Sequence, residues 1–219
     1  MTENLSRFVY DELRQRILDG RLPAGESISE REIGSELDVS RVPIREALPL
    51  LAAAGLVTLS PRRPAVVTPV TRSGVDELYD IRAVLEPFVA RQAAARVAAG
   101  ADASPLRNTL ALAAAAVQGN DLDGFHCHSG EVHTEIERLS GSALFVEVMA
   151  PLHERSDRLN VANIHTDPAQ RHNEHEALVD AIAGGRPDLA SAVAFAHVEW
   201  GRTRTLHTLE EVPGYAPDL

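Results

Sequence analysis

The chain has no lysine, a single cysteine, few aromatic residues and no long apolar run, and each shortage excludes something. Cys127 alone cannot form a disulfide within the chain or a cysteine-rich zinc site, which fits a reducing compartment. No segment approaches the roughly 20 consecutive apolar residues of a membrane span, and residues 1–20 lack the apolar centre of a signal peptide. We therefore expect a cytoplasmic protein with no membrane partner.

What the chain does have is length, alanine and leucine. Its 219 residues are 44% hydrophobic but only 4% aromatic, and its β-branched runs are short. This composition favours helices, and domains usually contain about 100 to 150 residues. We predict a mainly α-helical chain of two domains, residues 1–70 and residues 71–219.

Charge is distributed unevenly between these two parts. The net charge of −11 by itself disfavours DNA, because phosphate binding relies on clustered cations. Residues 1–70 carry nine arginines against ten acidic residues, whereas residues 71–219 carry twelve against twenty-two, and every histidine lies after residue 125. The acidic excess belongs to the second part, so the two parts are predicted to have different functions.

Three helices are predicted in the first part. Apolar residues at helical spacing indicate a helix at residues 6–20 with Ser6 as its N-cap, followed by a loop. A capping box, in which Glu32 follows Ser29 by three residues, begins the second helix. The third helix follows after a short turn and begins at Ser40, whose hydroxyl is expected to cap it. Two helices joined so closely must cross steeply.

A β-hairpin is predicted after the third helix. Residues 56–59 and 65–68 are short β-prone runs, and the turn between them carries Arg62 and Arg63. This hairpin is a wing with a basic tip. Residues 1–70 are therefore predicted to form a winged helix-turn-helix with a small β-hairpin wing.

The second part is predicted to be an all-α bundle. Alanine- and leucine-rich helical segments alternate there with short breaks at Gly, Pro or Asp. The tail from Pro213 is expected to be loosely held. The predicted helices lie near residues 73–99, 103–118, 121–139, 142–160, 167–184 and 187–209.

The turn that begins the third helix offers the side chains that DNA recognition requires. In a helix-turn-helix, the N-terminal end of the second helix of the pair enters the major groove. Arg41 and Arg45 are one turn apart on one face, and arginine is well suited to guanine. Arg31 and the two wing arginines extend the same positive surface. A solvated helical face is the alternative for any single arginine, but five of them at three contact points favour DNA.

The sequence also resembles a known family. Four segments resemble the N-terminal domain of GntR-family regulators: residues 22–26, 29–33, 39–48 and 54–57. Residues 79–86 resemble the opening of the FCD effector domain of the FadR subgroup. The resemblance implies a homodimer on a near-palindromic double-stranded DNA operator, and a small-molecule effector. It places DNA contacts at Arg31, Ser40, Arg41, Val42, Pro43, Arg45, Arg62 and Arg63.

Three histidines of the second part match positions at which the FCD domain often holds a metal. The resemblance implies one Asp and three His ligands, and the matching histidines are His133, His175 and His197. Ser129, a weak neutral ligand, stands in place of the Asp. A divalent metal, zinc or nickel, is expected on the three histidines. Water, the effector, His126 or His128 would complete its shell.

Two other interpretations of these histidines remain open. They can hydrogen-bond an anionic effector directly in a pocket without metal, or they can be buried polar residues satisfied by their neighbours. Arg82 matches a family position that faces the pocket, and its guanidinium suits a carboxylate effector. A pair with Glu86 within the same helix is an equally common role. The candidate effector-binding residues are Arg82, Ser129, His133, His175 and His197.

These features predict a ligand-responsive transcription regulator, a repressor released by a small organic acid, and not an enzyme. A histidine-metal enzyme is the alternative from another class, but no acidic residue has the spacing that marks a general base. A constitutive DNA binder without an effector is the third alternative. It would leave a second part far larger than dimerisation requires.

Overall fold

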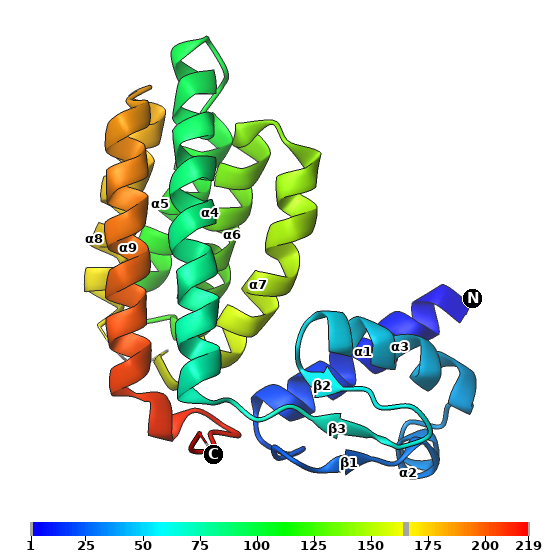
Figure 1. Cartoon of the computed structure of the whole chain (residues 1–219). Helices are drawn as coiled ribbons and strands as arrows, with labels where there is room; N and C mark the ends of the chain where they lie inside the picture. Colours follow the sequence, from blue (N-terminus) through cyan, green and yellow to red (C-terminus); the bar gives the residue numbers. More distant parts are fainter. Residues whose placement is uncertain (1, 164–166, 219) are drawn as a thin grey trace. The chain divides into compact units, whose positions relative to one another are not determined.

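The computed structural model describes residues 2–163 and 167–218, which fall into two compact units (Figure 1). The N-terminal unit consists of the described residues up to Val75, together with Ala150–Ala162 and those from Thr208 onward. The helical unit consists of Asp76–Met149 and the described residues from Asn163 to His207. Two segments that are late in the sequence thus belong to the N-terminal unit.

Three helices form the core of the N-terminal unit: α1 (Thr2–Leu18), α2 (Glu30–Glu36) and α3 (Arg41–Ala53). Their apolar stripes meet in one buried cluster, and burying each large apolar side chain contributes roughly 1.5 to 3 kcal/mol. α3 continues past the exposed Pro49. The cluster includes Val9, Leu13 and Ile17 of α1, Ile33 of α2, and Ile44, Leu48 and Leu51 of α3.

Of the three serines predicted to cap helices, only Ser29 makes the capping hydrogen bond. Ser29 caps α2 as predicted, accepting a hydrogen bond from the backbone N–H of Glu32 at 3.4 Å. Ser6 is not an N-cap, because α1 begins earlier and the Ser6 hydroxyl donates instead to Glu46. Ser40 occupies the N-cap position of α3, but its hydroxyl makes no capping hydrogen bond. The residue at which a helix begins and the tertiary contacts nearby therefore decide whether a serine hydroxyl caps the helix.

The N-terminal unit also holds a three-stranded antiparallel sheet in the order β1-β3-β2. The predicted hairpin is present as β2 (Val57–Thr58) and β3 (Ala65–Val67). β1 (Ser27–Ile28), which lies in a segment expected to be a loop, pairs with β3 so that Ile28 faces Ala65. β1 has only two residues, which is too short for a hydrophobic pattern to show. Its partner β3 is distant in sequence, so the sequence alone could not reveal this strand.

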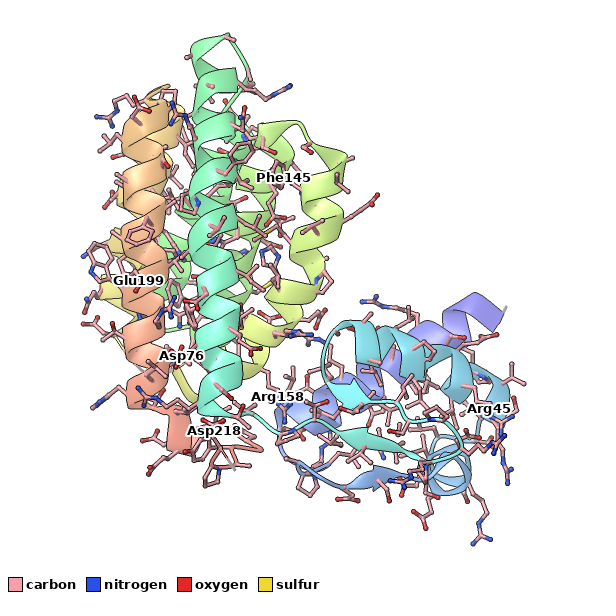
Figure 2. The ribbon with its side chains drawn as sticks, viewed as in Figure 1. Arg45, Asp76, Phe145, Arg158, Glu199 and Asp218 are labelled. Atoms are coloured by element: carbon pink, nitrogen blue, oxygen red, sulfur yellow. The ribbon has the colours of Figure 1, made fainter. Side chains whose placement is uncertain are left out.

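The C-terminal tail is held in the N-terminal unit, and the prediction of a loose tail is wrong. The backbone N–H of Val70 donates to Gly214 at 2.9 Å, and that of Ala216 donates to Val70 at 2.8 Å. The buried Arg158 donates to the Thr68 carbonyl at 2.6 Å. Burial lowers the pKa of Arg158 to about 10. In Figure 2, Arg158 is labelled between Asp218 of the tail and Arg45 of α3.

The helical unit is a bundle, and the predicted helices are confirmed with small shifts at their ends. Figure 1 shows them as long helices side by side. α7 has its first residues in this unit and continues into the N-terminal unit from Ala150. No helix of the described residues is both long and apolar enough to cross a membrane. The helices are α4 (Arg72–Ala98), α5 (Ser104–Gln118), α6 (Leu122–Ser140), α7 (Ala143–Asn163), α8 (Pro168–Ala183) and α9 (Pro187–His207), followed by the short 3₁₀ helix η1 (Leu209–Glu211).

Alanine dominates the core of the helical unit. Small side chains let neighbouring helices approach closely, and larger apolar residues of α6 and α8 fill the space between them. The mainly α-helical fold, with a winged helix-turn-helix followed by an all-helical domain, is therefore confirmed. The core includes Ala90, Ala93 and Ala94 of α4, Val132 and Ile136 of α6, Leu178 and Ile182 of α8, and Ala190 and Ala194 of α9.

Candidate functional site

The outer face of α3 carries the predicted DNA-reading side chains. Because α3 turns its apolar stripe toward α1 and α2, Arg41, Val42 and Arg45 are left exposed, and Val42 is 55% exposed. Pro43 is different, because it is buried in the first turn, where a missing N–H costs no helical hydrogen bond. It supports the start of α3 rather than presenting a surface to a ligand.

The arginines predicted to contact DNA are exposed, and most of them lack an acidic partner. Arg45 is the exception, since its Nε lies 2.9 Å and 3.1 Å from the carboxylate oxygens of Glu30 on α2. Side chains without a partner keep all their hydrogen-bond donors available to phosphates and bases. Among the residues that the structure describes, no ion pair is made by Arg31, Arg41, Arg62 or Arg63.

The wing tip holds its two arginines on a strained turn. The backbone N–H of Arg63 donates to the Ser60 carbonyl at 3.2 Å, which closes the turn. Arg62 has a φ of 62°, in the left-handed region. That conformation costs a residue other than glycine roughly 1 to 2 kcal/mol. Such strain persists most often at functional positions, and here the strained residue is an exposed arginine at the tip.

Three histidines from three helices meet inside the helical unit. His133 of α6, His175 of α8 and His197 of α9 each offer a ring nitrogen, and these nitrogens lie within 4.8 Å of one another. The ring centroids are 4.8 to 5.3 Å apart. The sequence prediction that these side chains gather is confirmed. We call them the histidine triad.

A carboxylate held by an arginine supports His197. Glu174, which is buried, lies with one oxygen 3.2 Å from Nδ1 of His197. Arg204 holds the same carboxylate through two bonds of 2.6 Å and 2.9 Å. Burial by itself would raise the pKa of Glu174, but its bonds to His197 and Arg204 lower it below the ordinary value. Glu174 is therefore an ionised carboxylate that accepts a hydrogen bond from Nδ1–H of His197, which leaves Nε2 as the ligand nitrogen.

His133 has a similar but looser partner. Its Nδ1 lies 3.8 Å from one oxygen of Glu86, and Arg82 of the same helix holds the other oxygen at 2.6 Å. Burial by itself would raise the pKa of Glu86, yet the charges of Arg82 and His133 hold it at about 2. The pair within α4 is thus the role of Arg82 in the structure. Its guanidinium would have to leave Glu86 to bind an effector.

His175 is the most deeply buried member of the triad. It is 2% exposed, and its Nδ1 makes no hydrogen bond to any described residue. Burial, together with the neighbouring His197 and His133, lowers the pKa of His175 well below 6.5. The ring is therefore neutral near pH 7 and has a lone pair for a metal or a proton for an anion.

The donor set of the triad fits a divalent metal. Neutral imidazoles are good ligands for zinc and nickel, and Ser129, one turn before His133, is buried with a hydroxyl that bonds to no described residue. The proposed completion of the shell by His126 or His128 is not supported. His128 instead forms an exposed group on α6 with Cys127 and Glu131, and its Nδ1 lies 2.8 Å from Glu131.

A small cavity adjoins the triad on the side of His133. Carboxylates and apolar side chains both line it, and as it stands it has room for a molecule about the size of water. Its lining includes Glu86, His133, Glu137, Met149, Leu178 and Ala194.

Sequence reasoning named the Arg82–Glu86 pair but missed the charges near His175 and His197. Glu174 adjoins His175 in sequence, and Arg204 follows His197 by two helical turns, so both lie on helices that were already singled out. Arg171 precedes His175 by one turn and is buried at 8% exposure. Spacing of three, four or seven residues from a candidate ligand is the signal that would have found Arg171 and Arg204.

Known proteins resemble this chain in both units. Residues 5–67 match the family described as "Bacterial regulatory proteins, gntR family", and residues 77–199 match the FCD domain. The gluconate operon transcriptional repressor of Bacillus licheniformis is 45% identical over 78 residues, which are 36% of this chain and 32% of that repressor. This chain therefore corresponds to only about a third of that relative.

Two further similarities extend over nearly the whole chain. An uncharacterized HTH-type transcriptional regulator of Streptomyces ambofaciens is 28% identical over 218 residues, 97% of this chain and 88% of that protein. The E. coli structure McbR/YncC matches 94% of this chain and 98% of its own with a TM-score of 0.75; at 19% identity it supports the fold alone. With a match to the gntR family in the N-terminal unit and to the FCD domain in the helical unit, the chain belongs to the GntR family of bacterial transcriptional regulators.

Proposed function

We propose that this regulator is a repressor whose affinity for its operator is changed by a small organic acid bound in the helical unit. The observation that carries the DNA-binding part is the pair Arg41 and Arg45, exposed one turn apart at the start of α3. A helix that enters the major groove by its N-terminal end presents this face to the bases. A regulator of chromosomal DNA acts in the cytoplasm, as the sequence predicts.

The proposed DNA surface has three parts. The start of α3 contributes base contacts, the start of α2 contributes phosphate contacts, and the wing tip reaches a neighbouring groove or phosphate. Pro43 leaves the predicted set because its side chain is buried. The proposed contacts are Arg31, Ser40, Arg41, Val42, Arg45, Arg62 and Arg63.

Gel shifts with DNA fragments from upstream of the chain's own gene and of neighbouring genes test this surface. Wild-type protein should prefer one fragment over a shuffled sequence. The double variant R41A/R45A should lose at least tenfold in affinity, since each base-reading arginine contributes about 1 to 3 kcal/mol. R107A, which removes an exposed arginine from α5 of the helical unit, is the matched control and should bind like wild type. Equal affinity for every fragment would refute the proposal.

The histidine triad is proposed to hold zinc or nickel. When bound, such an ion supplies positive charge that attracts a carboxylate effector. The chain's own contribution is to hold the ligands in place: Glu174 fixes the ring of His197, and Arg204 fixes Glu174. Elemental analysis of the purified protein should find about one ion per chain, and H175A should abolish it. Equal metal content in the two proteins would refute the site.

Pairing of two chains is proposed through an apolar face of the helical unit. α4 exposes Ile81, Val84 and Phe88 along one stripe, and Val84 is 70% exposed. Phe88 stacks near Phe145 of α7, with ring centroids 5.3 Å apart. Contiguous exposed apolar surface usually marks an interface. Light scattering should give twice the chain mass for wild type and the single mass for V84R.

A dimer reads a near-palindromic operator because its two-fold symmetry places two α3 helices on two half-sites. Effector binding changes operator affinity only if the effector binds one arrangement of the two heads more tightly than the other. Repression is proposed because the relative with 45% identity, aligned over the DNA-reading part, is a repressor.

A further inference from the structure

A second group of metal-ligand side chains lies on α6, apart from the histidine triad. Cys127, His128 and Glu131 each offer one ligand atom, and these three atoms lie within 4.8 Å of one another. Nδ1 of His128 is 2.8 Å from a carboxylate oxygen of Glu131. The group shares no residue with the triad, and the proposed function makes no use of it.

Helical spacing brings these three side chains together. Glu131 follows Cys127 by four residues and His128 by three, and residues three or four apart are neighbours on a helix surface. All three therefore lie on one side of α6, within about a third of its circumference. Phe125 and Ser129 are buried on the other side of the helix. Because α6 packs by that buried side, it holds the three ligands together on its outer surface.

The group is open to solvent. Cys127 is exposed and forms no disulfide, and the side chains of His128 and Glu131 are 28% and 52% exposed. A Cβ atom placed on Gly130 would meet nothing within 4 Å, so the helix surface next to Glu131 is unobstructed. In the described part of the chain, no arginine pairs with Glu131. An ion can therefore reach all three ligand atoms without displacing an arginine.

The three ligands differ from those of the triad in charge. A thiolate and a carboxylate together carry two negative charges, which balance a divalent cation, whereas the triad offers neutral imidazoles. Thiolates select zinc over magnesium or calcium, and imidazole and carboxylate are also zinc ligands. Residues 71–219 carry twenty-two acidic residues against twelve arginines, an excess that attracts cations. The donor set is therefore that of a zinc site.

The separations within the group suit a tetrahedral ion after small side-chain rotations. Zinc lies about 2.0 to 2.3 Å from its ligands, so ligand atoms around one ion lie roughly 3.3 to 3.6 Å apart. The ligand atoms of His128 and Glu131 are slightly closer than that, and no two ligand atoms of the group are more than 4.8 Å apart. Three protein ligands leave one tetrahedral position for water.

We propose that Cys127, His128 and Glu131 form an exposed zinc site on α6, separate from the histidine triad. When zinc binds, the Cys127 thiol releases its proton to solvent and the sulfur bonds to the ion as a thiolate, with no change of oxidation state. A bond from zinc to each side chain replaces the hydrogen bond between His128 and Glu131. Because the site is exposed and has only three protein ligands, its ion exchanges with solvent and is lost on dialysis. The ion retained through purification therefore reports on the triad.

Cobalt(II) is the probe in the first experiment, because a cobalt–thiolate bond absorbs in the near ultraviolet and cobalt held only by nitrogen and oxygen does not. Cys127 is the only cysteine, so this absorption reports on one site even when the triad also holds cobalt. Cobalt added to reduced, chelator-treated protein should produce the band, and H175A, whose folding is checked by circular dichroism, should keep it. Loss of the band in folded H175A would show that the site is not separate from the triad and would overturn the proposal.

Variants of the three ligands test whether the site is built from all of them. C127S should abolish the cobalt–thiolate band, and H128Q and E131Q should each weaken cobalt binding by at least about tenfold, since each removes one ligand. E147Q, which removes an exposed carboxylate from α7, is the control matched in charge and should bind cobalt like wild type. Absence of the band in wild type, or undiminished binding in H128Q or E131Q, would refute the three-residue site.

The second experiment measures zinc itself through the reactivity of the Cys127 thiol. Zinc should slow the reaction of this thiol with dithiobis(nitrobenzoate) by at least about tenfold, because a metal-bound thiolate is no longer free to attack. Magnesium at the same concentration should not slow it, since magnesium prefers oxygen ligands. Protection by zinc should be lost in E131Q and persist in E147Q. An unchanged rate with zinc, or equal protection of E131Q, would contradict the proposal. Neither experiment needs operator DNA or an effector, so a failure of the proposed function would leave both results standing.

Discussion

The arginines of the two candidate sites have opposite surroundings. In the N-terminal unit, Arg41 and the wing arginines are exposed and have no acidic partner among the described residues, whereas in the helical unit Arg82 and Arg204 are held against carboxylates inside the bundle. An exposed arginine keeps its donors for a polyanion, because DNA brings the matching charge. A paired arginine instead fixes the carboxylate that orients a histidine. Under the proposed function, the same type of side chain reads DNA in one unit and builds a site in the other.

The comparison predicts that removing one carboxylate destabilises the helical unit far more than the DNA-reading surface. E174Q keeps the shape of the side chain but leaves Arg204 without its anion. The free energy of unfolding should fall by about 3 kcal/mol, since breaking a buried pair leaves an uncompensated charge. Urea unfolding with a chelator present measures it. E30Q, which breaks the exposed pair with Arg45, should cost less than about 1 kcal/mol. Similar losses of unfolding free energy in E174Q and E30Q would contradict the contrast between a buried pair in the helical unit and an exposed pair in the N-terminal unit.

Lowering the pH should destabilise the helical unit, because His175 is buried in its interior. Its pKa in the folded protein is lowered below 6.5, while in the unfolded chain it is near 6.5. Below about pH 6.5 the unfolded chain therefore binds a proton that the folded protein does not. The contribution of His175 is fully present above that pH and is lost as pH falls toward its folded pKa, by up to about 1.4 kcal/mol per pH unit.

Unfolding of chelator-treated protein across pH 5 to 7 measures this slope, a range set around the ordinary histidine pKa of about 6.5. H175Q removes the titrating ring and should flatten the dependence. If wild type and H175Q lose stability in parallel, another group is responsible, and the burial of His175 does not govern the acid response.

Features that depend on local sequence patterns could be predicted, whereas those that depend on pairing between distant residues could not. The helices and the exposed pair on α3 follow from a spacing of three or four residues in the sequence. The wing follows from two short β-prone runs on either side of a turn. The histidine triad was identified through residues that resemble a family, and the structure brings all three together. β1, by contrast, exists only because Ile28 pairs with Ala65.

The same reason explains the charges that were missed. Glu174 and Arg204 are thirty residues apart, and only the packing of α8 on α9 brings their side chains together. Ser6 and Glu46 likewise meet through the packing of α1 on α3. The burial of Pro43 depends on which way α3 is turned, and the spacing of one turn of helix does not fix that rotation closely enough.

The smallest expected effect concerns the one DNA-reading arginine that does have a partner. Glu30 pairs with Arg45, so on the proposed surface it would compete with DNA for that arginine and place a negative charge near the phosphates. E30Q should therefore raise operator affinity, by up to about fivefold, because an exposed ion pair contributes roughly 0.2 to 1 kcal/mol. Fluorescence anisotropy at fixed salt measures the change. E36Q is the control on the same helix, since Glu36 pairs with Arg16, outside the reading face. Unchanged or weaker binding by E30Q would mean that Arg45 reaches DNA without leaving Glu30.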